Sequence, residues 1–298
     1  MRLLEPVTGY PYTPEGIAHI DLADLRPERE LGVDGKVHVD GGAYVGTGVD
    51  ERGIELDAHV HADQARLLIT SIVARLHQGG QIEGTVDLAH WLPLSPRAPV
   101  LVPAAPRTSR EASRRVTPPA HPGDETIPVD GKVIADFKSV SLDTILDMVS
   151  QPPFQRLGLD TRVNGRAVAT WVKGDDRTVA VDAKLGLSAP VNPSSAQEAP
   201  TSGTIDATYT QRDGAVDVRQ LELHLPQSEI TAHGELGAYP LTSPTALYVD
   251  FHSRDFSEFD TVLRSLGLHR RGKEGAAALP VALAGQADFD GTWAGSLV

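Results

Sequence analysis

The feature that most constrains this chain is a recurring alternation of apolar and polar residues with a period of two. Between Ile54 and Val60 every second residue is aliphatic, and the residues between them are charged or polar. Side chains two apart share a face of a strand, so each such segment has an apolar side and a wet side. The pattern recurs in residues 37–39, 54–60, 82–88, 163–171, 179–187, 205–209, 221–225, 230–236, 247–251 and 281–289. It is typical of an antiparallel sheet that is solvated on one face.

Helical patterns are few and short by comparison. Ser141 precedes apolar residues at helical spacing, which predicts a short helix over 141–150. Asp255 begins a similar pattern that Gly267 ends, which predicts a second helix over 255–267. The apolar run 67–76 is compatible with either a strand or a helix, because short apolar runs do not distinguish the two.

The chain also aligns with itself when it is shifted by 114 residues. Each of the two units has a strand, a short helix, a Leu-Gly-Leu sequence and a strand that opens with Gly and ends in Trp. At this shift residues 135–139 fall on 249–253. The Leu-Gly-Leu sequences at 157–159 and 266–268 and the segments Gly165–Trp171 and Gly285–Trp293 follow in the same order, at offsets close to 114; Gly84–Trp91 is similar to the last pair. Two interpretations stay open, namely coincidence among β-rich segments and an elongating β-repeat whose units bury their faces against one another.

Two segments of different composition divide this pattern. Residues 93–128 contain nine prolines, and residues 189–203 are small and polar, so both are predicted to be loops or linkers. The expected organisation is therefore a β-rich segment 1–92, the linker 93–128, a β-repeat 129–188, the loop 189–203 and a β-repeat 204–298. The linker holds a basic cluster that either contacts anionic lipid headgroups or, more commonly for such runs, is simply solvated: Arg107, Arg110, Arg114 and Arg115.

Composition excludes several functional classes. The formal net charge of −13 argues against a nucleic-acid partner, which requires a basic footprint. The absence of cysteine removes disulfides, thiolate metal sites and cysteine nucleophiles. Aromatic residues make up only 5% of the chain, so the apolar sides of the strands are mainly aliphatic.

Neither a secretory signal nor a transmembrane segment is predicted. Glu5, Pro6 and Gly9 interrupt the N-terminal apolar residues, and no stretch approaches the roughly 18 apolar residues that a spanning helix needs. The strand-like pattern of 291–298 stops without a polar tail, so we expect the sequence to be a fragment of a longer protein.

One pair of residues has the spacing of a metal site. His59 and His61 project from the same side of a predicted strand, in a D-x-H-x-H sequence similar to the first metal-binding segment of the amidohydrolase family. However, both lie on the polar phase, and the strands are not separated by the regular helices of a (β/α)₈ barrel. No nucleophile elbow or phosphate-binding loop occurs. We therefore predict no catalytic, cofactor or metal site, and a metal-dependent hydrolase using His59 and His61 is the least favoured alternative.

The chain repeats the order of strand, short helix, Leu-Gly-Leu and strand, and two of its predicted strands, 84–91 and 285–293, run from Gly to Trp. This combination resembles the TamB/AsmA-like superfamily, in particular its translocation and assembly module branch. The resemblance covers 130–187 and 203–298, and more weakly 33–92. It implies an all-β fold, an elongated twisted antiparallel sheet forming a U-shaped groove with short helices at its edges. It further implies a periplasmic, non-enzymatic part of an inner-membrane-anchored envelope protein that carries phospholipid acyl chains to the outer membrane, with an Omp85-type partner in outer-membrane protein assembly.

A one-sided apolar sheet must close on itself, pack against another layer or expose its apolar face. We predict that the apolar phase forms a lipid groove; the competing interpretation is the closed core of a β-sandwich or barrel. A secreted structural or adhesive β-repeat protein is a further alternative. The predicted groove residues are Val37, Val39, Ile54, Leu56, Val60, Val86, Leu88, Val179, Val181, Leu185, Leu221, Leu223, Leu247, Val249 and Phe251.

Overall fold

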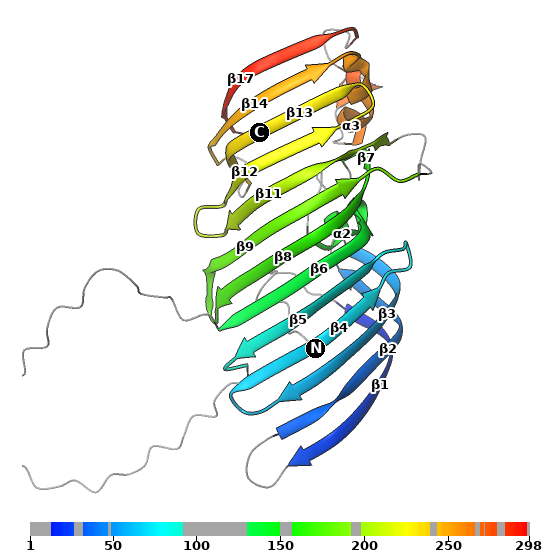
Figure 1. Ribbon diagram of the computed structural model, residues 1–298, viewed down its shortest axis with the longest axis vertical. Helices are drawn as coiled ribbons and strands as arrows, with labels where there is room; N and C mark the ends of the chain where they lie inside the picture. Colours follow the sequence, from blue (N-terminus) through cyan, green and yellow to red (C-terminus); the bar gives the residue numbers. More distant parts are fainter. Residues whose placement is uncertain are drawn as a thin grey trace, which may run out of the picture.

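A computed structural model describes residues 13–26, 32–46, 49–91, 130–149, 157–191, 198–238, 243–265, 269–270, 272–278 and 284–296. Thirteen strands form one long twisted sheet (Figure 1). They are β1 (Thr13–Arg26), β2 (Gly32–Gly46), β3 (Val49–Ala62), β4 (Arg66–Arg75), β5 (Gln81–Ala89), β6 (Gly131–Ser141), β8 (Arg162–Val172), β9 (Asp175–Ser188), β11 (Ser202–Thr210), β12 (Ala215–His224), β13 (Ser228–Gly237), β14 (Thr245–Ser253) and β17 (Ala287–Gly295). Two small ladders join β7 (Leu159–Asp160) to β10 (Ala199–Pro200) and β15 (His269–Arg270) to β16 (Lys273–Glu274).

The large sheet follows the chain order from β1 to β17, and every pairing within it is antiparallel. Within the described residues its first and last strands each pair on one side only, so the sheet stays open. The predicted elongated antiparallel sheet with few short helices is therefore confirmed. The ambiguous run 67–76 is a strand, β4, because it lies between two strands and supplies apolar residues to their shared side.

The register divides the sheet into two chemically distinct faces. Between β5 and β6, Ile82 lies opposite Phe137 and Val86 lies opposite Val133, and the same side continues through neighbouring strands. We call this side the apolar face. The residues between them form the polar face, on which Glu83 lies opposite Asp136. The period of two in the sequence thus becomes one continuous apolar surface and one surface that carries most of the charged side chains.

The helices are attached to the ends of particular strands. Helix α2 (Leu142–Val149) follows β6 directly and lies against β3 and β6. After β14 the chain forms the 3₁₀ helix η1 (Phe256–Phe259) and then α3 (Asp260–Ser265), with η2 (Gly275–Ala278) beyond them. The helix predicted over 255–267 is therefore divided into a 3₁₀ and an α-helical part. Figure 1 shows α2 and α3 on the same side of the sheet.

The predicted cap of the second helix is confirmed. Asp255 has extended backbone angles and its side chain accepts a hydrogen bond from the backbone N–H of Ser257. Ser141 is the last residue of β6, where it pairs with Arg162 of β8, and α2 begins at the next residue. The rings of Phe256 and Phe259 contact Phe251 with centroid distances of 5.6 and 5.3 Å. Since Phe251 is on the apolar face, η1 covers part of that face.

The two units found by self-alignment have the same topology. In each, a strand and a helix lead to a second strand that pairs with the first, as in β6–α2–β8 and β14–η1–α3–β17. One detail of the predicted units is wrong, because Gly84 and Gly165 are not the first residues of their strands. Gly84 lies inside β5 and pairs with Ala135, and Gly165 lies inside β8 and pairs with Phe137.

The predicted boundaries fall partly outside the described residues. The Pro-rich linker 93–128, its arginine cluster and the Leu-Gly-Leu at 266–268 all lie there. Of the loop 189–203, residues 199–200 form β10 and Ser202 already begins β11, so its last residues are not loop. The backbone N–H of Thr201 donates to the carbonyl of Asp160, and this bond ties that end of the segment to β7.

Candidate functional site

The predicted groove residues all lie on one face of the sheet. Their cross-strand partners are apolar in turn: Val37 lies opposite Ala58, Leu185 opposite Ile205, and Leu247 opposite Trp293. The full set, carried by β2, β3, β5, β9, β12 and β14, is Val37, Val39, Ile54, Leu56, Val60, Val86, Leu88, Val179, Val181, Leu185, Leu221, Leu223, Leu247, Val249 and Phe251. The structure thus joins residues more than 200 positions apart in the sequence into a single surface.

Partial exposure is common to this whole set. Each of these side chains is half-buried, and none is fully buried. Complete burial among large apolar side chains of the described residues is confined to a few positions such as Val140 and Val163, which pair across β6 and β8. A closed core would bury most of these aliphatic residues completely. The apolar face is therefore only partly covered.

Sequence reasoning missed several members of the same face. Ile69 and Ile72 of β4 both lie on it, although they are three residues apart. A register irregularity between them adds a residue to the strand, and Ser71 within it has a positive φ of 52°. A strict period-two search cannot follow a strand through such a bulge.

A depression of about 730 Å³ crosses β1 to β4 next to this bulge. Its lining includes Val37 and Ala58 from the apolar phase and His38 and Asp57 from the polar phase. Polar side chains and a hollow thus coincide at this end of the sheet.

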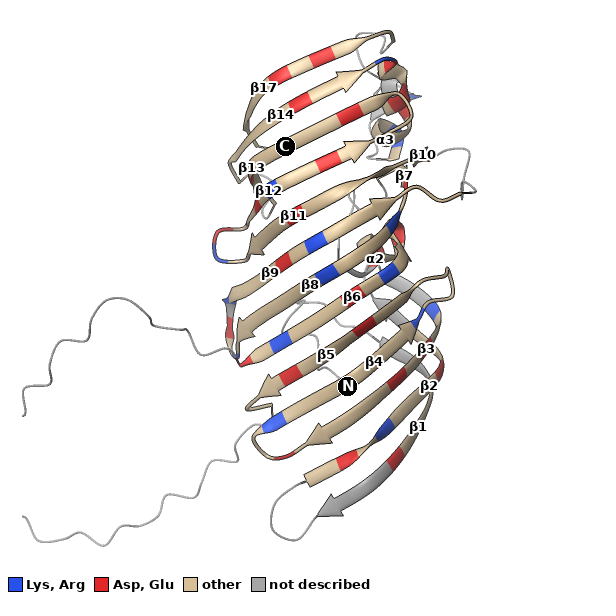
Figure 2. Cartoon of the chain, viewed as in Figure 1, with Lys and Arg blue, Asp and Glu red and all other residues tan. Residues whose placement is uncertain are grey.

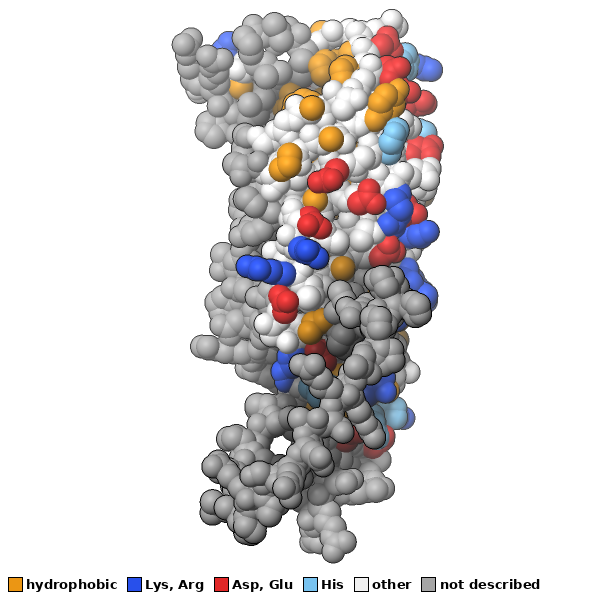
Figure 3. Space-filling model, turned by 90° about the vertical axis from the view of Figure 1, so that its left-hand side faces the viewer, with side chains coloured by type: hydrophobic (Ala, Val, Ile, Leu, Met, Phe, Trp, Pro, Cys, Tyr) orange, Lys and Arg blue, Asp and Glu red, His pale blue; other side chains and the backbone are white. Residues whose placement is uncertain are grey.

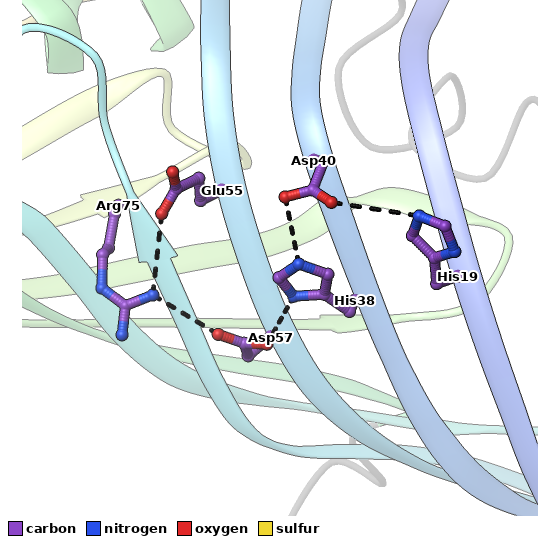
Figure 4. Close-up of polar contacts among 6 residues, drawn as sticks. All are labelled: His19, His38, Asp40, Glu55, Asp57 and Arg75. Atoms are coloured by element: carbon purple, nitrogen blue, oxygen red, sulfur yellow. Dashed lines mark hydrogen bonds and ion pairs between the residues drawn. The ribbon is translucent and has the colours of Figure 1, made fainter.

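The polar side chains of this region form a connected network (Figure 4). His38 lies 2.7 Å (Nδ1) from Asp57 Oδ1 and 3.1 Å (Nε2) from Asp40 Oδ1. Arg75 donates to Asp57 at 3.4 Å, and its Nη1 is 3.9 Å from Glu55. His19 reaches the other oxygen of Asp40 at 3.9 Å. Four neighbouring strands are thus joined by side-chain contacts across the sheet.

These contacts shift the pKa values of the groups involved. The hydrogen bond to Asp57 is the main cause that raises the pKa of His38, and the charge of Asp40 adds to it. The same bond is the main cause that lowers the pKa of Asp57, with Arg75 contributing less. All of these groups are exposed to solvent, so the network orients the side chains and contributes little energy.

The two histidines that have the spacing of a metal site, His59 and His61, contact a carboxylate. His59 Nε2 and His61 Nδ1 each lie 3.0 Å from one oxygen of Asp34 on β2. Their hydrogen bonds lower the pKa of Asp34, with that of His61 contributing most. In the part of the chain that the structure describes, no group of three or more histidine or acidic side chains is arranged to hold a metal ion. The pair therefore acts as a cross-strand link between β3 and β2.

Pairs of opposite charge cross the polar face from β4 to β12. Arg66 binds Asp87 through two hydrogen bonds, and Arg166 binds Asp136 in the same way at 2.7 and 3.0 Å. Arg219 donates to Asp182 at 2.8 Å. Figure 2 shows this alternation of blue and red along the strands, and in Figure 3 charged and histidine side chains line the right-hand margin of the molecule.

The last three strands of the sheet differ in charge from the strands before them. β13, β14 and β17 contain no Lys or Arg, and Figure 2 shows only red segments on them. On the polar face Asp250 lies directly opposite Asp290. Asp288 binds His252, and Tyr248 donates to Asp290, which raises the pKa of that tyrosine. Acidic side chains at this end of the sheet thus have only histidine and hydroxyl partners among the contacts of these three strands.

Comparison with known proteins adds no further constraint, since no family model, curated protein or solved structure matches the chain. Among the described residues, no helix has the length and apolar character required to cross a bilayer.

Proposed function

We propose that the apolar face is a lipid-binding groove that carries phospholipid acyl chains along the sheet. The observation that supports this most is the continuity of a partly exposed apolar surface across the thirteen strands. Exposed apolar surface of this extent marks an interaction site, since soluble proteins otherwise keep such patches small. The aliphatic side chains offer acyl chains a surface without hydrogen-bonding groups.

The polar face supports the same proposal, because its chemistry differs from that of the apolar face. Cross-strand pairs such as Arg166 with Asp136 keep that side solvated, so a lipid chain has only one favourable side to follow. The two faces are therefore expected to differ sharply in lipid contact although they belong to the same strands.

The direct experiment places a photo-crosslinking amino acid on neighbouring residues that point to opposite faces. Val86 and Val181 lie on the apolar face, and Thr85 and Ala180 are their matched controls on the polar face. After irradiation in cells of a diderm bacterium, mass spectrometry should find phospholipid attached at Val86 and Val181 and little at the controls. Equal labelling of both faces, or no lipid at either valine, would contradict the proposal.

By the family resemblance, we also propose a place for the chain in the cell envelope. The protein would be periplasmic, part of an inner-membrane-anchored molecule, and would act with an Omp85-type protein in outer-membrane assembly. Cell fractionation tests the location, and co-purification with the Omp85-type protein tests the partnership. These outcomes are independent of the crosslinking result, because a lipid groove does not require that partner.

A further inference from the structure

The backbone ladder is interrupted around Asp40 and Asp57. The register of β1 with β2 and that of β2 with β3 both shift next to Asp40, and the register of β3 with β4 shifts directly after Asp57. A bulge leaves a residue unpaired and disrupts the ladder locally. Contacts between side chains therefore contribute more to how these strands are joined here than they do along a regular ladder.

One imidazole ring joins β2 to β3 at this point. His38 Nδ1 lies 2.7 Å from an oxygen of Asp57 on β3, and its Nε2 lies 3.1 Å from an oxygen of Asp40 on β2 (Figure 4). A neutral imidazole has a single N–H donor, whereas a protonated imidazole has two, and an ionised carboxylate only accepts. Both contacts can therefore be hydrogen bonds at the same time only when His38 is protonated.

The charges on the polar face around His38 favour that proton. Four of the neighbouring groups are carboxylates, and two are cations that stay charged near neutral pH. The titratable and charged side chains that surround His38 on these strands are His19 and Asp21 of β1, Lys36 and Asp40 of β2, Glu55, Asp57 and His59 of β3, and Arg75 of β4. A positive charge on His38 partly balances this acidic surrounding.

The direction of the pKa shift agrees with the geometry. The hydrogen bond to Asp57 raises the pKa of His38 above its ordinary value of 6.5, and Asp40 adds to the effect. A histidine whose pKa is raised in the folded state stabilises that state below its unfolded pKa, and the contribution is lost as the pH rises through the folded value. Both contacts of His38 are therefore complete below pH 6.5, and one of them is lost at higher pH.

We propose that His38 is a proton-controlled link between β2 and β3. The protonated ring binds Asp57 and Asp40 together, and the neutral ring donates to Asp57 alone and releases Asp40. Strands β9, β11 and β12 are joined differently, because Lys184 binds Asp206 and Arg219 binds Asp182. Lys and Arg keep their charge throughout this pH range, so those contacts do not respond to it. This inference does not rest on lipid binding.

Nuclear magnetic resonance of the histidine ring nitrogens in the full chain tests the proton. The signal that disappears in His38→Gln identifies the ring, and its titration midpoint should lie above 6.5. Asp57→Asn should lower that midpoint more than Asp40→Asn does, because the bond to Asp57 is the larger cause of the shift. A midpoint at or below 6.5, or the same midpoint in all of these proteins, would overturn the proposal.

Hydrogen exchange tests the link between the strands. After correction for the intrinsic effect of pH, backbone amides of β2 and β3 near His38 should exchange about two- to five-fold faster at about pH 8 than at about pH 6. His38→Lys stays positively charged, so its exchange should be slow at both pH values. His38→Gln is neutral, so its exchange should be fast at both.

His224→Gln is the matched control, because His224 contacts Glu222 on its own strand, β12, and joins no second strand through that contact. It should leave the pH dependence of exchange in β2 and β3 unchanged. The proposal would be wrong if that dependence persisted in His38→Gln, or if amides of β11 and β12 showed it to the same extent.

Discussion

The two strand–helix–strand units share a sequence pattern and a topology but occupy different positions in the sheet. β8 of the first unit is covered by β9, whereas β17 of the second has no neighbour beyond β14 among the described strands. Trp171 of β8 is half-buried and Trp293 of β17 is 54% exposed. Equivalent residues thus pack between neighbouring strands in one unit and are exposed to solvent in the other, because the number of neighbouring strands differs.

Glycine substitution should give the largest difference between the units. Gly165 has φ +124°, and an added Cβ would lie 2.3 Å from the carbonyl oxygen of Lys184. Gly285 has φ +83° but has nothing within 4 Å. We expect Gly165→Ala to lower the free energy of unfolding by about 3 kcal/mol or more, since backbone strain and a backbone clash combine. Gly285→Ala should cost about 1 kcal/mol, from strain alone.

Urea denaturation followed by circular dichroism measures both variants. The comparison would fail if the two substitutions had the same effect, because only Gly165 is confined by a neighbouring strand. A loss of cooperativity in Gly165→Ala would itself indicate that β8 and β9 had separated.

Tryptophan truncation should give the next largest difference. The indole ring of Trp171 lies over Gly131, where an added Cβ would come within 2.1 Å of the ring. Trp171→Ala removes that cover and should cost about 2 kcal/mol, less than the full value for a completely buried tryptophan. Trp293→Ala should cost less than about 1 kcal/mol, because its ring already contacts solvent. Equal destabilisation in thermal unfolding would show that Trp293 is covered in solution.

The sheet itself could be predicted from sequence, because period-two alternation survives in almost every strand. The alternation also gave the correct face for Leu56, Val181 and Phe251, which the register joins on one surface. It did not distinguish a partly open face from a closed core, since both require the same pattern. That difference depends on how many layers cover the face, which is a property of the whole fold.

Other features of the site had no local sequence pattern. The contact of His38 with Asp57 depends on the register between β2 and β3. Bulges shift this register elsewhere along the same pair of strands. His59 and His61 had the spacing of metal ligands, but the partner that they meet, Asp34, is on another strand. The acidic end of the sheet was present in the sequence, yet only the pairing of β14 with β17 places Asp250 opposite Asp290.

Charge removal should change the two units in opposite directions. Asp136 of the first unit accepts two hydrogen bonds from Arg166, so Asp136→Asn should lower the free energy of unfolding by up to about 1 kcal/mol. Asp290 of the second unit faces Asp250, so Asp290→Asn should leave stability unchanged or raise it slightly. Chemical denaturation at low salt checks both. A loss in both variants would show that the hydrogen bond from Tyr248 stabilises the Asp290 carboxylate more than Asp250 repels it.

Acidification should give the smallest and most specific effect. The hydrogen bonds from Arg166 are the main cause that lowers the pKa of Asp136 below its ordinary value of 3.8. A carboxylate with a lowered pKa in the folded state stabilises the protein above its unfolded pKa, and this contribution is lost as the pH falls through the folded value. The stability difference between the unmodified protein and Asp136→Asn should therefore be constant near neutral pH and shrink below pH 3.8. A stability difference that stayed constant down to the acid unfolding transition would show that Arg166 does not bind the Asp136 carboxylate in solution. In that case the acidic residues of the first unit would resemble those of the second in having no Lys or Arg partner.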